Sequence, residues 1–186
     1  PVLSPLDKTK HKCIPDLGCG NGPIARKLIE LGFNAYGTDA SVQGITIAKE
    51  HYPDRFAIQD LSSQELPEAL SHLSFDTIIS TEVIEHLYDP RGFIKFCKHI
   101  LNDARGELIL TTPYHGYLKN LSIAISGKWD HHANPLWDGG HIKLWSNRTI
   151  RQLLEEQGFK VSVFRGCGRF PYFWKSMMIK ATLKDA

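Results

Sequence analysis

The sequence predicts an α/β fold, a doubly wound and mostly parallel sheet with helices on both faces. Two observations indicate this class. Short strand-like apolar runs alternate with segments of helical periodicity over most of the chain. The run from Phe75 to Ser80 has the apolar character of a strand buried on both faces. Ligands of such sheets bind at the carboxyl ends of the strands, where we expect the functional residues.

The first strand, over residues 12–17, leads through a glycine-rich turn into a helix. Pro15 is unusual within this strand, because proline has no N–H to donate to a neighbouring strand. Pro23 suits the first position of the helix, and Gly32 ends it. This strand, turn and helix form the first repeat of the alternating pattern.

The middle of the chain continues the alternation. A second strand over 33–38 ends at Asp39, and Ser41 can cap a helix that runs to about residue 51. Residues 62–73 are expected to be helical or loop. The remaining elements here are a third strand, a fourth strand, a helix and a fifth strand, over residues 56–58, 75–80, 89–101 and 107–112.

The last third departs from simple alternation. Residues 113–145 are rich in Tyr, Trp, His and Gly, with a short helix expected over 118–125 and an irregular loop over 127–140. A long irregular segment within a compact domain is usually functional or disordered. A helix and two strands close the fold, and the last strand is expected to be antiparallel; these elements cover residues 149–157, 159–164 and 174–183.

The glycine-rich turn is Asp16-Leu-Gly-Cys-Gly-Asn-Gly22. Glycines at alternate positions leave no β-carbons along the turn, so the backbone can bend sharply and approach a ligand closely. We expect free N–H groups at the start of the following helix. Asp16 ends the first strand and Asp39 ends the second, so two acidic side chains are predicted at the same edge of the sheet.

Composition limits the classes of function. The 186 residues predict one domain, and a net charge of +2 gives no strong signal for nucleic-acid binding. The four cysteines form no C-x-x-C pair, which favours free thiols in a reducing, cytoplasmic setting. No apolar run reaches transmembrane length and none resembles a signal peptide, while peripheral membrane contact stays open. The turn lies so near the start of the chain that we expect further residues upstream. No feature indicates an oligomeric state.

Five segments together are similar to the class I S-adenosylmethionine-dependent methyltransferases. They cover about two thirds of the chain in the order and spacing of that family: Asp16–Gly22, Gly37–Asp39, Gln59–Leu61, Phe75–Leu87 and Gly106–Pro113. Within the class, the chain most resembles the ubiquinone-biosynthesis O-methyltransferases and related small-molecule methylases. The resemblance implies a Rossmann-like, mostly parallel seven-stranded sheet and one methyltransferase domain over residues 1–186.

The resemblance also implies a donor site for S-adenosylmethionine, with S-adenosylhomocysteine as product. Asp39 would accept hydrogen bonds from both ribose hydroxyls, and Asp60 would accept from the adenine amino group. The implied cofactor-binding residues are Asp16, Gly18, Cys19, Gly20, Asp39, Ala40, Asp60, Leu61 and Thr81. A dinucleotide would also use an acid after the second strand, but the turn lacks the G-x-G-x-x-G spacing.

A second motif, Glu82-Val-Ile-Glu85-His86, follows the fourth strand. If this segment is helical, both carboxylates and the imidazole can lie on one side. Related methyltransferases carry a Glu-x-x-Glu-His metal motif, and some add a histidine from a later loop, which corresponds here to His141. The resemblance therefore implies a divalent-metal site, for Mg or a similar ion, formed by Glu82, Glu85, His86 and His141. Without a metal, the same side chains are only the polar wall of an active site.

Residues 114–145 are expected to form a substrate cap. The segment contains more aromatic side chains than an idle loop needs, and ligand pockets are typically aromatic. Three of its residues, Tyr117, Leu121 and Ile125, are interpreted as the core face of a short helix. His115 follows the fifth strand and, like His86, is a candidate general base.

The resemblance implies methyl transfer to a phenolic or enolic oxygen of a small molecule, and His86 or His115 is the candidate catalytic base. One alternative is 2′-O-methylation at the 3′ end of an RNA, although no basic stripe supports it. Another is a non-catalytic S-adenosylmethionine-binding protein, although the donor motif is intact. The sequence leaves the identity of the acceptor open.

Overall fold

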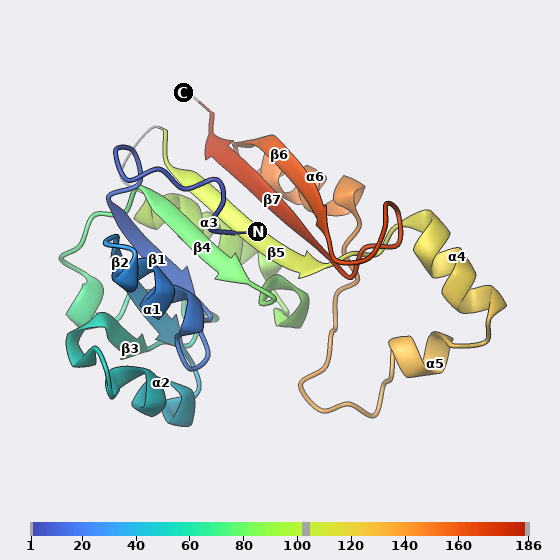
Figure 1. The fold of residues 1–186 in the computed structure, drawn as a ribbon, viewed down its shortest axis with the longest axis horizontal. Coiled ribbons are helices and arrows are strands. Elements are labelled where there is room, and N and C mark those ends of the chain that lie inside the picture. The colour runs from blue at the N-terminus through green and yellow to red at the C-terminus, as the bar shows by residue number, and fades with distance from the viewer. Residues whose placement is uncertain (1, 102–104, 185–186) are drawn as a thin grey trace.

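The computed structural model describes residues 2–101 and 105–184. These form a seven-stranded sheet in the order β3-β2-β1-β4-β5-β7-β6 (Figure 1). Strands β1 to β5 are parallel, whereas β7 is antiparallel to both β5 and β6, which confirms the predicted sheet. The strands are β1 (Cys13–Leu17), β2 (Asn34–Asp39), β3 (Phe56–Ile58), β4 (Thr77–Thr81), β5 (Glu107–Pro113), β6 (Phe159–Cys167) and β7 (Ser176–Leu183).

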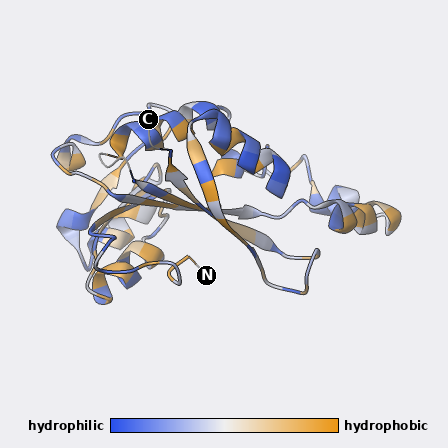
Figure 2. Ribbon diagram, turned by 90° about the horizontal axis from the view of Figure 1, so that it is seen from above, coloured by the Kyte–Doolittle hydropathy of each residue, from blue (hydrophilic) through white to orange (hydrophobic). Residues whose placement is uncertain are grey.

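Helices cover both faces of the sheet, as Figure 2 shows. The helices are α1 (Pro23–Glu30), α2 (Val42–Lys49), α3 (Pro90–Ile100), α4 (Tyr117–Ile125), α5 (Trp129–His132) and α6 (Asn147–Glu156). Three 3₁₀ turns, η1 (Pro53–Arg55), η2 (Glu68–Leu70) and η3 (Ile84–His86), lie between them. The Ser41 side chain accepts a hydrogen bond from the Gly44 N–H, which confirms Ser41 as the cap of α2.

Successive residues of the central strands pack alternately into two hydrophobic clusters, one on each face of the sheet. Ile78 of β4 and Leu108 of β5 pack in the cluster that contains the apolar faces of α3 and α6. Their neighbours Ile79 and Ile109 pack in the opposite cluster, with Leu28 of α1. Both faces of the central strands are therefore buried, as expected for a doubly wound sheet.

Pro15 stands in a central strand, because β1 lies between β2 and β4. β1 shares five register pairs with β2 but one with β4, Asp16 with Ile79. The Ser80 hydroxyl adds a side-chain hydrogen bond to the Leu17 carbonyl at 2.8 Å. A sparse ladder on one side of β1 is what a missing N–H would produce.

The segment over residues 114–145, which we call the cap, follows β5 and stands apart from the sheet in Figures 1 and 2. It contains α4 and α5, so the loop predicted over residues 127–140 is helical at Trp129–His132. Backbone hydrogen bonds fasten the ends of the cap to the domain. The His115 N–H donates to the Trp145 carbonyl, and the N–H groups of Ile142 and Lys143 donate to the Glu85 carbonyl.

The apolar side of α4 faces away from the protein, so its predicted core face is wrong. Tyr117 and Ile125 are 79% and 78% exposed, and Leu121 is also exposed. The buried residue of the helix is Lys119, at 6% exposure. The cause is that α4 stands beyond the end of β5 instead of lying on the sheet.

None of the helices in the described ranges is long and apolar enough to span a membrane.

Candidate functional site

The glycine-rich turn joins β1 to α1 and depends on left-handed backbone angles. Gly18, Gly20 and Gly22 have φ angles of +77°, +56° and +79°. A β-carbon on Gly18 would lie 2.3 Å from Val83 Cγ2, so the turn also packs closely against the segment after β4. Two independent constraints therefore require glycine at position 18.

Most N–H groups of this turn bond within the protein. The N–H groups of Gly18 and Cys19 both donate to the Thr38 carbonyl, at 2.8 and 2.9 Å. The Gly22 N–H donates to the Cys19 carbonyl, and the first helical residue, Pro23, has no N–H. The turn was therefore not built as a cradle for a phosphate, which needs several free N–H groups.

Asp39 stands at the carboxyl end of β2 and organises the turn. Its Oδ2 accepts a hydrogen bond from the Gly20 N–H at 2.7 Å, and its Oδ1 accepts from the Ser41 N–H at 2.8 Å. Each carboxylate oxygen has further lone pairs that can accept from a ligand. The side chain is thus held in place with acceptor capacity left over.

A cavity of about 610 Å³ lies at the carboxyl ends of β1 to β4. Its size is in the range of small-molecule sites. Of the predicted cofactor residues, six line this donor pocket: Gly18, Gly20, Asp39, Ala40, Asp60 and Leu61. His86 and Glu82 also line it, whereas Asp16, Cys19 and Thr81 do not.

The donor pocket includes residues that sequence reasoning missed. They come from the segments after β3 and after β4, and they are Gln59, Ser62, Gln64, Val83, Leu87, Tyr88 and Asp89. A usable signal was present in the chain, because both segments directly follow strands whose carboxyl ends point to one edge of the sheet. The side chains could not be chosen individually without the turns that direct them.

Asp16 lies beneath the turn, at 1% exposure, and so does not line the pocket. Burial raises the pKa of its carboxyl to about 7, and the nearby charge of Asp39 adds to the rise while the Ala25 N–H opposes it. Neither carboxylate oxygen makes a hydrogen bond of good geometry among the described residues. Cys19 is buried too, and its Sγ donates to the Gly20 carbonyl.

Three of the four predicted metal ligands come together. One ligand atom from each of Glu85, His86 and His141 lies within 4.8 Å of the others. Glu82 is not in this group, because its backbone is left-handed, at a φ of +54°, and its Oε1 accepts from the Ser176 hydroxyl. The 3₁₀ turn η3 begins only at Ile84, so Glu82 lies outside it and its side chain is not directed by the helical spacing that the sequence analysis assumed.

The Glu85 carboxylate is fully buried and only half satisfied. Its Oε2 accepts from the Thr112 hydroxyl at 2.9 Å, and its Oε1 has no partner among the described residues. Burial raises the pKa of Glu85 to about 7, and the neighbouring Glu82 charge adds to the rise. A cation bound here would satisfy Oε1, so the residues present fit a metal ion.

The two candidate bases lie in different surroundings. The Nδ1 atom of His86 lies 3.2 Å from the Gly140 carbonyl, so an N–H at Nδ1 leaves the Nε2 lone pair available. His115 does not line the donor pocket, and it is buried at 6% exposure. Burial lowers the pKa of His115 to about 4, and the charge of Lys119 lowers it further. His86 is therefore the better placed base.

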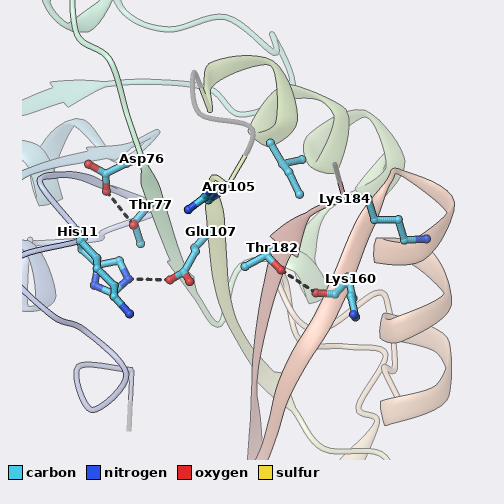
Figure 3. Close-up of a pocket in the computed structure, with 10 residues that line it drawn as sticks. His11, Asp76, Thr77, Arg105, Glu107, Lys160, Thr182 and Lys184 are labelled. Carbon is cyan, nitrogen blue, oxygen red and sulfur yellow. Dashed lines mark hydrogen bonds and ion pairs between the residues drawn. The ribbon is translucent and has the colours of Figure 1, made fainter. Parts of the chain in front are cut away.

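A larger cavity, of about 820 Å³, lies at the other ends of the central strands (Figure 3). Its acids are engaged inside the protein. Glu107 Oε2 lies 2.7 Å from His11 Nε2 and 2.6 Å from Lys180 Nζ, and Asp76 accepts from the Thr77 hydroxyl. Since sheets of this class bind ligands at the carboxyl ends of their strands, the smaller donor pocket is the candidate site.

Comparison with known proteins gives a family match. A family profile described as a methyltransferase domain matches residues 2–162. The ubiquinone biosynthesis O-methyltransferase of Chelativorans sp. (strain BNC1) is 34% identical over 116 residues, which are 61% of this chain and 45% of that protein. The enzyme of the same description from Dinoroseobacter shibae is 27% identical over 154 residues, 79% of this chain and 59% of that protein. The chain thus spans about half the length of these curated relatives.

Solved structures show the same fold. The magnesium protoporphyrin IX methyltransferase of Synechocystis PCC 6803 with bound SAH superposes with a TM-score of 0.68 at 22% identity, covering 92% of this chain and 74% of that one. An S-adenosylmethionine dependent methyltransferase from Mesorhizobium loti gives a TM-score of 0.71 at 19% identity, with 97% and 95% covered.

Proposed function

Since this chain belongs to the methyltransferase domain family of the class I S-adenosylmethionine-dependent methyltransferases, we propose that it transfers a methyl group from S-adenosylmethionine to an oxygen of a small phenolic or enolic molecule. The curated relatives are O-methyltransferases by name, which supports oxygen as the acceptor atom. The four cysteines carry no disulfide, which supports a reducing, cytoplasmic setting.

The choice of S-adenosylmethionine as the methyl donor rests mainly on the hydrogen bonds within the glycine-rich turn. A dinucleotide needs free N–H groups for its pyrophosphate, and the N–H groups of Gly18, Cys19, Gly20 and Gly22 are already bonded. The Asp39 carboxylate lines the donor pocket, and the Asp16 carboxyl is buried below it. Acidic surroundings favour a cationic ligand, and S-adenosylmethionine carries a sulfonium and an ammonium.

The donor would lie along the carboxyl ends of β1 to β3. The Gly18-Cys19-Gly20 backbone would lie against the methionine part, with Asp16 beneath it. The free lone pairs of Asp39 would accept from the ribose hydroxyls. Asp60 and Leu61, which follow β3, would contact the adenine. Ala40 and Thr81 would flank this path.

The acceptor would approach from the side of β4 and the cap. Transfer is a direct displacement, so alignment of acceptor oxygen, methyl carbon and sulfur in a dry site is the main work of the enzyme. His86 lines the pocket, and its Nε2 would take the proton of the attacking hydroxyl. His115 would act from outside the pocket, as part of the acceptor site.

A divalent cation would be held by Glu85, His86 and His141, whose ligand atoms already lie within 4.8 Å of one another. One carboxylate and two imidazoles suit Zn or Fe at least as well as Mg. A bound cation would lower the pKa of a hydroxyl that it contacts. Its presence would occupy the His86 lone pair, so the metal and the base are alternatives for that atom.

The experiment is methyl transfer from labelled S-adenosylmethionine to a panel of catechols and simple phenols, with a short RNA as the competing acceptor. We expect label in at least one small phenol and none in the RNA. A His86→Asn variant should bind S-adenosylhomocysteine normally while losing transfer. Label in the 3′-terminal nucleotide of the RNA would overturn the small-molecule proposal. Donor binding with no transfer to any acceptor would favour a non-catalytic binding protein.

A further inference from the structure

The buried side of α4 is polar, whereas the side of a helix that faces a protein is usually apolar. Lys119 is its buried residue, and the Lys119 Nζ donates to the Tyr114 carbonyl at 2.7 Å. An ammonium has three N–H donors, so one bond leaves two of them to satisfy. Among the described residues no carboxylate forms an ion pair with Lys119.

Two histidines lie beside this buried ammonium. The rings of His115 and His132 have centroids 5.2 Å apart. Neither ring nitrogen of His115, nor Nε2 of His132, has a hydrogen-bond partner of good geometry in the described part of the chain, although the Asn120 side chain is near His115. Buried polar atoms in native proteins usually have a hydrogen-bond partner, so these nitrogens have the capacity to bond to a polar ligand group.

The electrostatics of the cluster are unbalanced toward positive charge. Burial lowers the pKa of Lys119, and the charge of Arg169 on the β6–β7 connection lowers it further. Burial and the Lys119 charge likewise lower the pKa of His132. Within the described residues, Glu82 is the acid whose charge raises the pKa of Lys119, and its Oε1 accepts a hydrogen bond from the Ser176 hydroxyl. An anionic group would relieve this imbalance.

The cluster adjoins the donor pocket through His141. The charge of His141 lowers the pKa of both His115 and His132, so the three histidines belong to one electrostatic cluster. The His141 ring contacts the ring of His86 with centroids 5.0 Å apart, and His86 lines the donor pocket. A small aromatic acceptor could therefore place a hydroxyl near His86 and a substituent near Lys119.

We propose that Lys119, His115 and His132 form an anion site in the cap that binds a carboxylate on the methyl acceptor. The inference rests on the proposed function, because the site serves the acceptor of that reaction. One buried ammonium matches the single charge of a carboxylate better than the double charge of a phosphate monoester. The imidazoles, protonated at one nitrogen each, can donate to the carboxylate oxygens.

The test compares two acceptors that differ in one charge, 3,4-dihydroxybenzoate and its methyl ester, with labelled S-adenosylmethionine. The wild-type protein should favour the acid by about 10- to 100-fold in kcat/KM, the range of one charge-assisted hydrogen bond. In Lys119→Met this preference should vanish through a rise in KM for the acid, with the ester unchanged. Lys128→Met, which alters an exposed lysine of the same cap, is the matched control and should keep the preference.

Equal rates for acid and ester in the wild-type protein would overturn the proposal, and this comparison needs no variant to fold. A loss in Lys119→Met that is equal for acid and ester would show a structural role alone. If no acceptor is methylated, the proposed function fails, and calorimetry with benzoate then decides the anion site separately. Benzoate should bind the wild-type protein and not Lys119→Met; no binding to either, or tighter binding of phenyl phosphate, would contradict a carboxylate site.

Discussion

Removing the Asp39 carboxylate should abolish most of the affinity for the donor. In the structure its two oxygens are fixed by the N–H groups of Gly20 and Ser41, at 2.7 and 2.8 Å, and keep lone pairs toward the pocket. Two ribose hydroxyls would each donate to this carboxylate. At about 1.5–3 kcal/mol for each charge-assisted bond, Asp39→Ala should weaken S-adenosylhomocysteine binding by about 3–6 kcal/mol, or ~10²- to 10⁴-fold.

Calorimetry with S-adenosylhomocysteine and its 2′,3′-dideoxy analogue separates the ribose bonds from damage to the turn. For the wild-type protein, loss of the two ribose hydroxyls should reduce the affinity by about the same factor as Asp39→Ala reduces the affinity for S-adenosylhomocysteine. Asp39→Ala should bind the two ligands equally. Asp54→Ala, in the 3₁₀ turn η1, is the control and should leave affinity unchanged. If the losses of binding free energy caused by the variant and by the analogue simply add, the assignment of Asp39 to the ribose is refuted.

Three further results are expected. Gly18→Ala should lower the free energy of unfolding by about 2–5 kcal/mol, because the new β-carbon would clash with Val83. Gly20→Ala has open space around its β-carbon and should lower this free energy by only about 1–2 kcal/mol, so equal losses in urea unfolding would contradict the reasoning. Asp16 holds a proton in the folded state between its ordinary pKa of 3.8 and about 7, so the free energy of unfolding should fall by up to about 4 kcal/mol as the pH rises through that window. In urea unfolding at pH 4, 6 and 8, Asp16→Asn should not show this dependence on pH. Chelation, and separately His141→Ala, should remove transfer activity, with rescue of the chelated protein by Zn, Fe, Mn or Mg; full activity in chelator and no bound metal in elemental analysis would leave His86 as a simple base.

The sheet could be predicted because its signals are local. Several of the parallel strands, such as β3 and β4, contain short apolar runs, and the cap of α2 depends on one side chain, Ser41, within one turn of helix. The position of Asp39 at the pocket follows from the same logic, since the end of a parallel strand fixes which edge of the sheet a residue occupies. The positions of the parallel strands and the edge that carries the donor site could thus be predicted from the chain itself.

The packing of the cap helix could not be predicted in this way, because burial there depends on what a helix lies against. An apolar stripe predicts a core face only when the helix packs on a core, and α4 instead turns Lys119 inward and Tyr117 outward. The same limit applies to Glu82, whose left-handed backbone directs it to Ser176 and away from Glu85. Both cases depend on contacts between distant parts of the chain.

Titration calorimetry of the protein with S-adenosylhomocysteine and, in parallel, with NAD⁺ tests the central claim most directly. The internally bonded N–H groups of the glycine-rich turn and the acids beside it predict one-site binding of S-adenosylhomocysteine and no binding of NAD⁺. Binding of NAD⁺ without binding of S-adenosylhomocysteine would contradict the account of the donor pocket.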